Sequence, residues 1–265
     1  MDVSVIIITK NQKELLVRTI STLKQQTFKG KYEIIVVDSG STDGAKEYCR
    51  SQKVKLVNIP SQNFNYANAL NKGARVAEGR YLVRLSGDCI PQGKNFLAEL
   101  TMPFNDFKVG GTFGKYVISG RKGYTYPDYW PPSRFPKKLT RYSIKPFLFM
   151  GAGVLNFSLG KNVYEFAGGC CAVRKSTWEK RPFNERLLAG EDAEYSWFLH
   201  LIGYDIVYNP KAVALHEHKK DLGKTLRTYP GFNKWNWIFN QNIRVYWLKR
   251  IFLGEDPYKK FHLPK

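Results

Sequence analysis

The sequence predicts an α/β protein with a doubly wound, mostly parallel sheet. Two observations support this fold class. Within the first hundred residues, apolar runs of strand length alternate with segments of helical periodicity. The strongest of these runs are apolar throughout instead of alternately polar, which is typical of parallel strands that helices cover on both faces.

Four strands are expected at residues 3–8, 33–37, 54–59 and 81–85. The run at 3–8 is almost entirely Val and Ile, which favour the extended backbone. Polar and glycine residues follow the first, second and fourth runs and should end the strands there. Because a helix separates each pair of strands, right-handed crossovers would make the sheet parallel.

Three helices are expected between these strands. The apolar residues of the first recur at helical spacing: Leu15, Leu16, Ile20 and Leu23. Asn11 is its expected N-cap residue. The second helix is expected at about 45–52. The third lies within 65–79, where Gly79 is expected to end it.

The regular alternation fades after about residue 100. Residues 163–178 resemble a strand, a helix is expected from about Asp192, and two strands are expected near 205–208 and 212–216. Near the C-terminus, residues 232–254 have the apolar spacing of a helix. The second half should therefore be a less regular arrangement of strands and helices.

Residues 124–146 contain five prolines and many aromatic residues. Such a segment is too aromatic for a disordered linker, so we expect an ordered excursion or lid over a site. Gly168 and Gly169 follow in the strand-like segment. They either let an acceptor approach the backbone closely or mark a bulge.

The formal net charge of the 265-residue chain is +20. Such a field favours anionic partners such as nucleic acid, anionic lipid or phosphorylated small molecules, but a solvated lysine-rich surface would give the same charge. No apolar run reaches the ~20 residues of a membrane span, and the N-terminus lacks the basic start of a signal peptide. We therefore expect a cytoplasmic protein.

The four cysteines form no zinc-binding pattern and are expected to be free, packed thiols: Cys49, Cys89, Cys170 and Cys171.

Polar residues follow three of the expected strands, at 9–11, 38–43 and 86–88. In a parallel sheet the carboxyl ends of the strands share one edge, which is where ligands bind. Each group alone could simply be a turn, because Asp and Gly end many strands. The chain lacks both the GxGxxG and the GxxxxGK[ST] phosphate-binding fingerprints. Together the three groups predict a site of another kind.

Longer motifs support a family resemblance. "VSVIIITKNQKELLVRTISTLKQQTF", "YEIIVVDSGSTDG", "ALNKGARVAEGRYLVRLSGDCIP" and "PFNERLLAGEDAEYSWFLHLIGYDIVYNPKAVALHEH" together resemble family 2 glycosyltransferases. "FNYANALNKGA", "SGDC" and "HEH" are most similar to bacterial-type rhamnosyltransferase-like members. The resemblance covers about residues 2–218. It implies the GT-A fold, in which a Rossmann-like nucleotide-binding half joins a mixed-sheet acceptor half.

The resemblance also implies roles for individual residues. Asp38 would accept hydrogen bonds from the donor's base, while Thr9 and Asn11 would line the nucleotide pocket. Asp88 would be the last carboxylate of the D-x-D motif, which holds a divalent cation against the donor diphosphate. The implied donor-binding residues are Thr9, Asn11, Asp38, Ser39, Asn71, Ser86, Gly87 and Asp88.

The implied cofactor is Mn²⁺ or Mg²⁺. Ser86 replaces the first Asp of D-x-D, but one carboxylate, phosphate oxygens and water can hold such an ion. His216, with His218 two residues further along the same strand face, lies where some family members bring a histidine to the metal or phosphate. Either histidine could equally be structural.

Asp192 would be the general base, with Glu191 beside it. Displacement of a nucleoside diphosphate leaves concentrated negative charge, and the acceptor hydroxyl must lose a proton to a positioned carboxylate. The resemblance implies that the reaction inverts the anomeric configuration. Acidic residues at a helix start also favour the helix dipole, and the two roles are compatible.

We expect a nucleotide-sugar half at 1–100, an acceptor and catalytic half at 101–220, and a C-terminal extension at 221–265. Residues 219–265 hold 11 Lys or Arg against 3 Asp or Glu among many aromatic residues. This extension could lie on an anionic membrane or pack on the domain.

The expected partners are a nucleoside-diphosphate sugar, a glycan or lipid-linked acceptor and the cytoplasmic face of a membrane. A catalytically silent glycan or nucleotide-sugar binder has the same fold. A nucleic-acid-binding protein would explain the charge, but no recognition motif supports it.

Overall fold

The computed structural model describes residues 1–118, 136–143, 166, 168–187 and 190–217. The chain divides into two units, Met1–Glu217 and His218–Lys265, and the second lies wholly outside the described residues. The expected C-terminal helix, His218 and most of the proline-rich segment are therefore not described.

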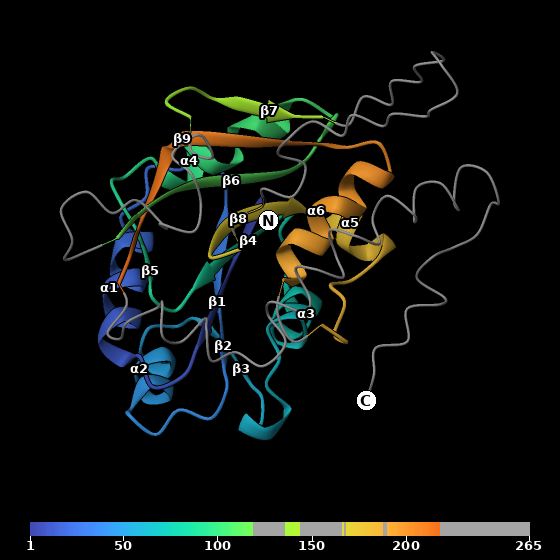
Figure 1. The fold of residues 1–265 in the computed structure, drawn as a ribbon. Coiled ribbons are helices and arrows are strands. Elements are labelled where there is room, and N and C mark those ends of the chain that lie inside the picture. The colour runs from blue at the N-terminus through green and yellow to red at the C-terminus, as the bar shows by residue number, and fades with distance from the viewer. Residues whose placement is uncertain (119–135, 144–165, 167, 188–189, 218–265) are drawn as a thin grey trace, which may run out of the picture. The chain divides into compact units, whose positions relative to one another are not determined.

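The first half of the chain alternates strands and helices as predicted (Figure 1). Its elements are β1 (Val3–Thr9), α1 (Lys13–Lys24), β2 (Tyr32–Asp38), α2 (Ala45–Ser51), β3 (Lys55–Asn58), η1 (Ser61–Asn63), α3 (Tyr66–Val76) and β4 (Tyr81–Ser86). The second half comprises β5 (Cys89–Pro91), α4 (Phe96–Thr101), η2 (Met102–Asn105), β6 (Val109–Ile118), β7 (Thr140–Tyr142), β8 (Cys170–Arg174), α5 (Lys175–Lys180), α6 (Glu191–Leu201) and β9 (Asp205–His216).

The described strands form one sheet in the order β3-β2-β1-β4-β8-β6-β9-β5, with β7 also paired to β9. β3, β2, β1 and β4 are all parallel. β8 runs antiparallel to both β4 and β6, while β6 and β9 are parallel. The predicted parallel half and mixed half are both confirmed.

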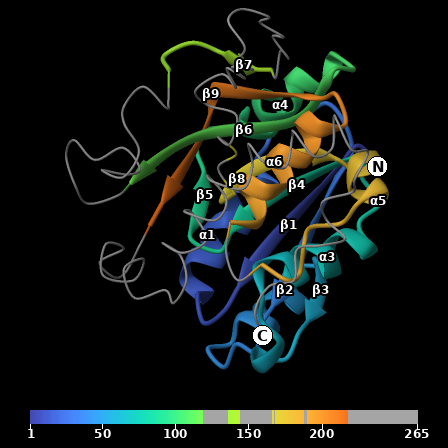
Figure 2. The same ribbon diagram turned by 45° about the vertical axis from the view of Figure 1, so that its right-hand side comes forward.

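Helices cover both faces of the sheet (Figure 2). β1 shows this most directly, because all seven of its residues are buried. Val5 and Ile7 belong to one core cluster with Leu16 and Ile20 of α1. Ile6 and Ile8 belong to the other cluster, with residues of α3 and α6: Leu70, Tyr195 and Leu199. The predicted doubly wound arrangement is confirmed.

Two predicted helix boundaries are wrong. α1 begins at Lys13 with Gln12 as its N-cap residue, because Asn11 adopts a left-handed backbone (φ 51°). α3 ends at Val76, before Gly79. A Cβ at Gly79 would lie 2.4 Å from the Ser4 nitrogen, so glycine is needed there for close approach to β1.

The second half differs more from the prediction. Residues 175–180 continue as helix α5 instead of strand, and α4 and β6 were not predicted. β9 is one strand, where two were expected. Pro210 falls at its register shift, where Gly114 pairs with Asn209 but Lys115 pairs with Val213. The proline interrupts the ladder without ending the strand.

No described helix has the length and apolar character to cross a membrane.

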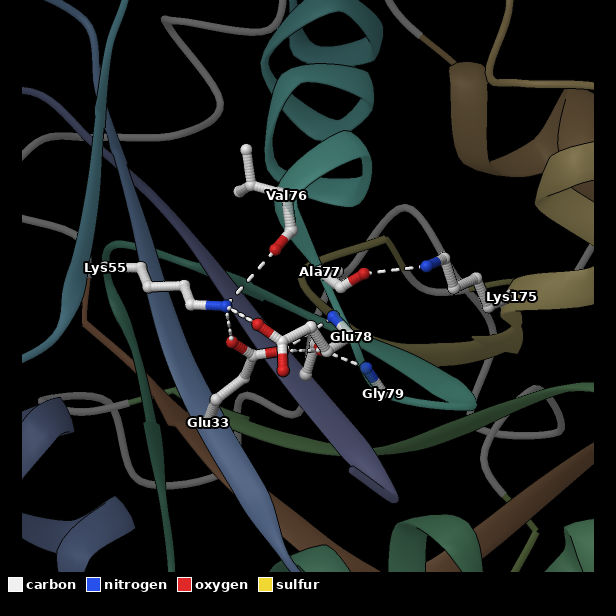
Figure 3. A network of polar contacts seen from close by, with 8 residues as sticks. Glu33, Lys55, Val76, Ala77, Glu78, Gly79 and Lys175 are labelled. Carbon is white, nitrogen blue, oxygen red and sulfur yellow. Dashed lines mark hydrogen bonds and ion pairs between the residues drawn. The ribbon is translucent and has the colours of Figure 1, made fainter.

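A polar network ties the α3–β4 connection to the amino ends of β1 and β2 (Figure 3). The Glu33 carboxylate accepts hydrogen bonds from Ser4 Oγ at 2.6 Å and from the Glu78 nitrogen at 2.7 Å. Lys55 Nζ lies 2.7 Å from its other oxygen. Burial acts to raise the pKa of Glu33, but these three donors outweigh it and hold that pKa below its usual value. This network is at the edge opposite the predicted site.

Replacing Glu33 with Gln should lower the free energy of unfolding by about 2 kcal/mol at pH 7, the usual range for hydrogen bonds to a charged group. Because the folded-state pKa is lowered, the carboxylate stabilises the fold above the unfolded-state pKa. That contribution is lost as the pH falls through the folded-state pKa. Urea unfolding of both proteins from pH 7 to pH 3.5 would measure this.

Glu47→Gln is the matched control, since Glu47 makes only an exposed pair with Arg50. It should leave stability unchanged. A Glu33→Gln loss that does not shrink with falling pH would contradict the electrostatic explanation.

Candidate active site

The carboxyl ends of β1, β2 and β4 lie side by side at one edge of the sheet. Thr9 is paired with Asp38, and Ile8, one residue before Thr9, is paired with Ser86. The three polar groups that the sequence places after these strands therefore meet. This is the edge at which open α/β sheets bind ligands.

Hydrogen bonds join the loops after β1 and β2. The Asn11 nitrogen donates to Ser41 Oγ at 2.9 Å, and Asn11 Oδ1 accepts from the Thr42 nitrogen at 2.8 Å. Ser39 Oγ donates to the Thr9 carbonyl at 3.2 Å. Asn11 and Ser39 thus hold the shape of this edge, and their side chains are already engaged in the protein.

Two buried oxygens at this edge have no hydrogen-bond partner among the described residues. Asp38 Oδ1 accepts from the Gly40 and Ser41 nitrogens, but Asp38 Oδ2 is unpartnered. Thr9 Oγ1 is also unpartnered, and both residues are at most 2 % exposed. An unsatisfied buried polar atom is costly, so these oxygens are suited to a ligand that donates hydrogen bonds.

Gly87 lies where β4 passes close to the end of β1. A Cβ there would lie 2.3 Å from Gln12 Oε1 and 2.7 Å from the Ile8 carbonyl oxygen. Only glycine leaves room for this contact. The Ser86 nitrogen donates to the Gly169 carbonyl at 3.1 Å, which joins β4 to the turn before β8.

Asp88 and His216 meet although they are far apart in the sequence. β5 pairs with the end of β9, and His216 Nε2 lies 3.1 Å from Asp88 Oδ1. Both side chains are largely buried. A carboxylate and an imidazole in contact form a suitable partial ligand set for a divalent metal, to which a diphosphate and water would add oxygens.

Cys89 lies in the same group, its sulfur within 4.8 Å of the Asp88 and His216 ligand atoms. Burial raises the pKa of this thiol well above its usual value. Without a metal, this thiol is therefore protonated at neutral pH.

Asp192 and Glu191 both lie in the first turn of α6, but their side chains differ in exposure and in their partners. Asp192 is partly exposed, and its carboxylate accepts from the Gly168 nitrogen and the Ala193 nitrogen, each at 2.8 Å. Glu191 is 3 % exposed and makes an ion pair with Arg84 at 2.7 Å. Asp192 caps a free helix amide and also remains accessible for chemistry, so both readings of this residue are compatible.

Asn71 lies away from the strand-end loops, on the inner side of α3. Its side-chain nitrogen donates to the Phe183 carbonyl and to Glu185, and its oxygen accepts from Trp178 Nε1 and the Phe183 nitrogen. Because the buried amide is saturated within the protein, Asn71 stabilises the segment before α6 and has no group left for the donor.

Arg84 was not singled out by the sequence, and Gly168 was singled out only together with Gly169, for close approach of an acceptor or a bulge. Arg84 had a visible signal, because a cation in the middle of the apolar run "YLVRL" is unusual. Gly168 had none beyond its glycine pair.

Comparison with known proteins shows which family the chain resembles. The family model described as "Glycosyl transferase family 2" matches residues 4–180. Among curated proteins, glycosyltransferase AglE of Haloferax volcanii is 26% identical over 95% of this chain and 76% of its own. O-antigen chain rhamnosyltransferase WbaN of Salmonella anatum is 25% identical over 70% of this chain and 56% of its own.

Solved structures show the same fold at low identity. S. aureus TarS residues 1–349 superpose with a TM-score of 0.64 at 18% identity, covering 86% of this chain and 64% of that one. Mannosyltransferase PcManGT from Pyrobaculum calidifontis, solved with GDP-Man and Mn²⁺, gives 0.59 at 20% identity, covering 97% and 66%. The predicted GT-A fold class is confirmed. The chain spans less than two thirds of several of these relatives.

The buried thiols give a direct test of the site's packing. All four cysteines are free and buried. Burial raises the pKa of Cys49 to about 11 and of Cys170 to about 12, and raises that of Cys89 and Cys171 well above the usual value. The native protein at pH 8 should resist alkylation by iodoacetamide, and mass spectrometry should find four alkylated cysteines after denaturation. Rapid native modification of Cys89 would contradict the packing around Asp88.

Proposed function

Because the chain belongs to glycosyl transferase family 2, we propose that it transfers a sugar, with inversion, from a nucleoside-diphosphate sugar to a hydroxyl of a glycan or lipid-linked acceptor. The family resemblance expected from the sequence motifs is confirmed, and with it the class of enzyme. The observation that carries the proposed reaction is a continuous series of contacts. β1 joins β2 to β4, since it pairs Thr9 with Asp38 and Ile8 with Ser86, and the 168–169 turn joins β4 to Asp192.

The donor's base is assigned to the pocket of Asp38 and Thr9. The unpartnered oxygens of these residues can accept hydrogen bonds from a nucleobase or ribose. Such bonds would offset the cost of burying the two oxygens without a partner. TarS has been solved with UDP-GlcNAc and PcManGT with GDP-Man, so relatives of this fold bind nucleotide sugars. Asn11, Ser39 and Gly87 shape the pocket around these two residues.

The divalent cation is assigned to Asp88 and His216, with Ser86 beside them. When bound there, Mn²⁺ or Mg²⁺ would neutralise the charge that develops on the departing diphosphate. The imidazole favours Mn²⁺, because Mg²⁺ prefers oxygen ligands. The net charge of +20 adds a general attraction for the anionic donor.

Asp192 is assigned the role of general base. Its two backbone donors hold the carboxylate in one orientation, and each oxygen keeps a lone pair that can take a proton from the acceptor hydroxyl. Direct displacement at the anomeric carbon with one such base inverts the configuration. Glu191 acts from the buried side of the same helix turn and does not meet the acceptor.

The acceptor is assigned by the chemistry of the relatives. They include an O-antigen chain rhamnosyltransferase and a poly-β-1,6-N-acetyl-D-glucosamine synthase, both of which act on glycans. We assign residues 1–100 to the donor and 101–220 to the acceptor and catalysis. Residues 221–265, rich in cations and aromatic residues, are assigned to contact with an anionic membrane surface at which a lipid-linked acceptor would lie.

Nucleotide binding tests the donor site. Calorimetry with UDP, dTDP and GDP, each with and without Mn²⁺, should find one base that binds in a metal-dependent way. Asp88→Ala and His216→Ala should each weaken that binding at least tenfold, because each removes a metal ligand. Asp106→Ala is the control, since Asp106 is an exposed carboxylate paired with Arg141.

Tight binding that ignores both metal and Asp88 would mean that the enzyme works without a cation, as the serine at position 86 allows. Absence of binding by all three nucleotides would contradict the proposed function.

Turnover tests the general base. Asp192→Asn should lower the rate of nucleoside-diphosphate release from UDP-glucose, UDP-N-acetylglucosamine, dTDP-rhamnose or GDP-mannose, with water as the acceptor of the sugar, by roughly 10²–10⁴-fold, the usual contribution of a positioned base. Its affinity for the matching nucleotide should stay at the wild-type value, because Asp192 contacts no proposed donor-binding residue. A wild type that binds a nucleotide but turns over none of its sugars would favour the silent binder.

A further inference from the structure

Arg84 is a charged residue inside the sheet. It lies in the middle of β4 between Val83 and Leu85, which are both fully buried, and is itself 7 % exposed. Removing a guanidinium from water costs several kcal/mol unless other groups compensate. A β-strand does not itself require a cation at this position. The reason for the buried guanidinium must therefore lie in the groups around it.

Arg84 has one strong partner and an incomplete set of hydrogen bonds. Its Nη2 lies 2.7 Å from Glu191 Oε1, and its guanidinium lies 5.7 Å from the centre of the Tyr66 ring. Its Nε and Nη1 are buried without a hydrogen-bond partner among the described residues. If Arg84 served only to stabilise the fold, we would expect more of the five N–H donors of its guanidinium to have partners.

The unpartnered Nη1 faces Asp192. A Cβ built on Gly168 would lie 2.6 Å from Arg84 Nη1 and 2.4 Å from Asp192 Oδ2. Both atoms therefore lie against the same side of Gly168, whose nitrogen also donates to Asp192 Oδ2. Any side chain at position 168 would separate the guanidinium from the carboxylate.

The charges around Arg84 favour this arrangement. The groups that face it are Glu191 and Asp192 from α6, Cys171 from β8 and Tyr116 from β6. Burial acts to lower the pKa of Arg84, but the two carboxylates outweigh it and raise that pKa, so the cation is permanent. Burial raises the pKa of Glu191, and Arg84 opposes that rise.

We propose that Arg84 is a positioning residue for the transfer reaction: paired with Glu191, it fixes the first turn of α6 and so holds the Asp192 carboxylate in its place beside Gly168. This inference rests on the proposed function of Asp192. Arg84 is assigned no contact with donor or acceptor, since its guanidinium is buried among side chains of α3, α6, β6 and β8.

A second ion pair on α6 supplies the matched control. Arg181 makes two contacts with Glu194, at 2.7 and 3.1 Å, one turn after Glu191. Its guanidinium packs on the ring of Phe198, 4.1 Å from the centroid. This pair also joins a buried glutamate of α6 to an arginine, but it does not face Asp192.

The experiment compares Arg84→Met, Arg84→Lys, the double variant Arg84→Met/Glu191→Met, and Arg181→Met. The double variant removes both buried charges together, which proteins often tolerate without loss of stability. Binding of UDP and GDP with Mn²⁺ is measured by calorimetry. kcat is measured as release of UDP from UDP-N-acetylglucosamine and of GDP from GDP-mannose, with water as the acceptor of the sugar, together with the thermal midpoint.

Arg84→Met should lower kcat roughly 10–100-fold, as expected for a misplaced catalytic group, while the nucleotide Kd stays within about twofold. Arg84→Lys keeps the charge beside Glu191, so its kcat should recover in part. Arg181→Met should lower the thermal midpoint but not kcat.

The double variant decides between positioning and simple charge neutralisation. We expect its kcat to remain at least tenfold low. A return to the wild-type kcat would overturn the inference, since Arg84 would then only neutralise Glu191. An unchanged kcat in Arg84→Met would also overturn it while leaving the proposed function intact. A wild type inactive on every donor tested would instead count against the proposed function itself.

Discussion

The parallel pairing of β1 with β2 on one side and β4 on the other is the constraint on which the site depends. β1 is buried along its whole length, so its register is fixed by apolar packing on both faces. Given that register, Thr9, Asp38 and Ser86 must end at the same level. The polar residues need no long-range attraction to meet, because the core brings them together.

Buried polar groups at the amino and carboxyl ends of the parallel strands differ in how many partners they have. At the amino edge, every oxygen of Glu33 has a donor or a cation beside it, and the α3–β4 connection is held firmly. At the carboxyl edge, Asp38 and Thr9 each keep an unpartnered buried oxygen. Such groups lower stability, and a ligand that donates hydrogen bonds would satisfy both of these oxygens.

The second half of the chain completes the site by returning to the sheet. β8 runs back along β4 and places the Gly168–Gly169 turn beside Ser86, while β9 ends with His216 against Asp88. The buried Arg84–Glu191 pair then fixes α6 on this surface. These contacts of β8, β9 and α6 are all made with the part of the sheet that the first half of the chain forms.

The sequence by itself determined the parallel half, because continuous apolar runs and helical spacing are local signals, and its strand-end residues Thr9, Asp38 and Asp88 follow from them. It did not reveal β6, whose glycines carry no strand signal. Gly110 and Gly111 lie against Leu199, and Gly114 lies against Ala212 and Cys170, so close packing requires glycine at these positions. Nor could it show that Glu191 is buried against Arg84 while Asp192 stays partly exposed, or that the Asn71 amide is saturated within the protein. Only the tertiary structure decided these points, because burial and partners 24 to 114 residues away set what each side chain can do.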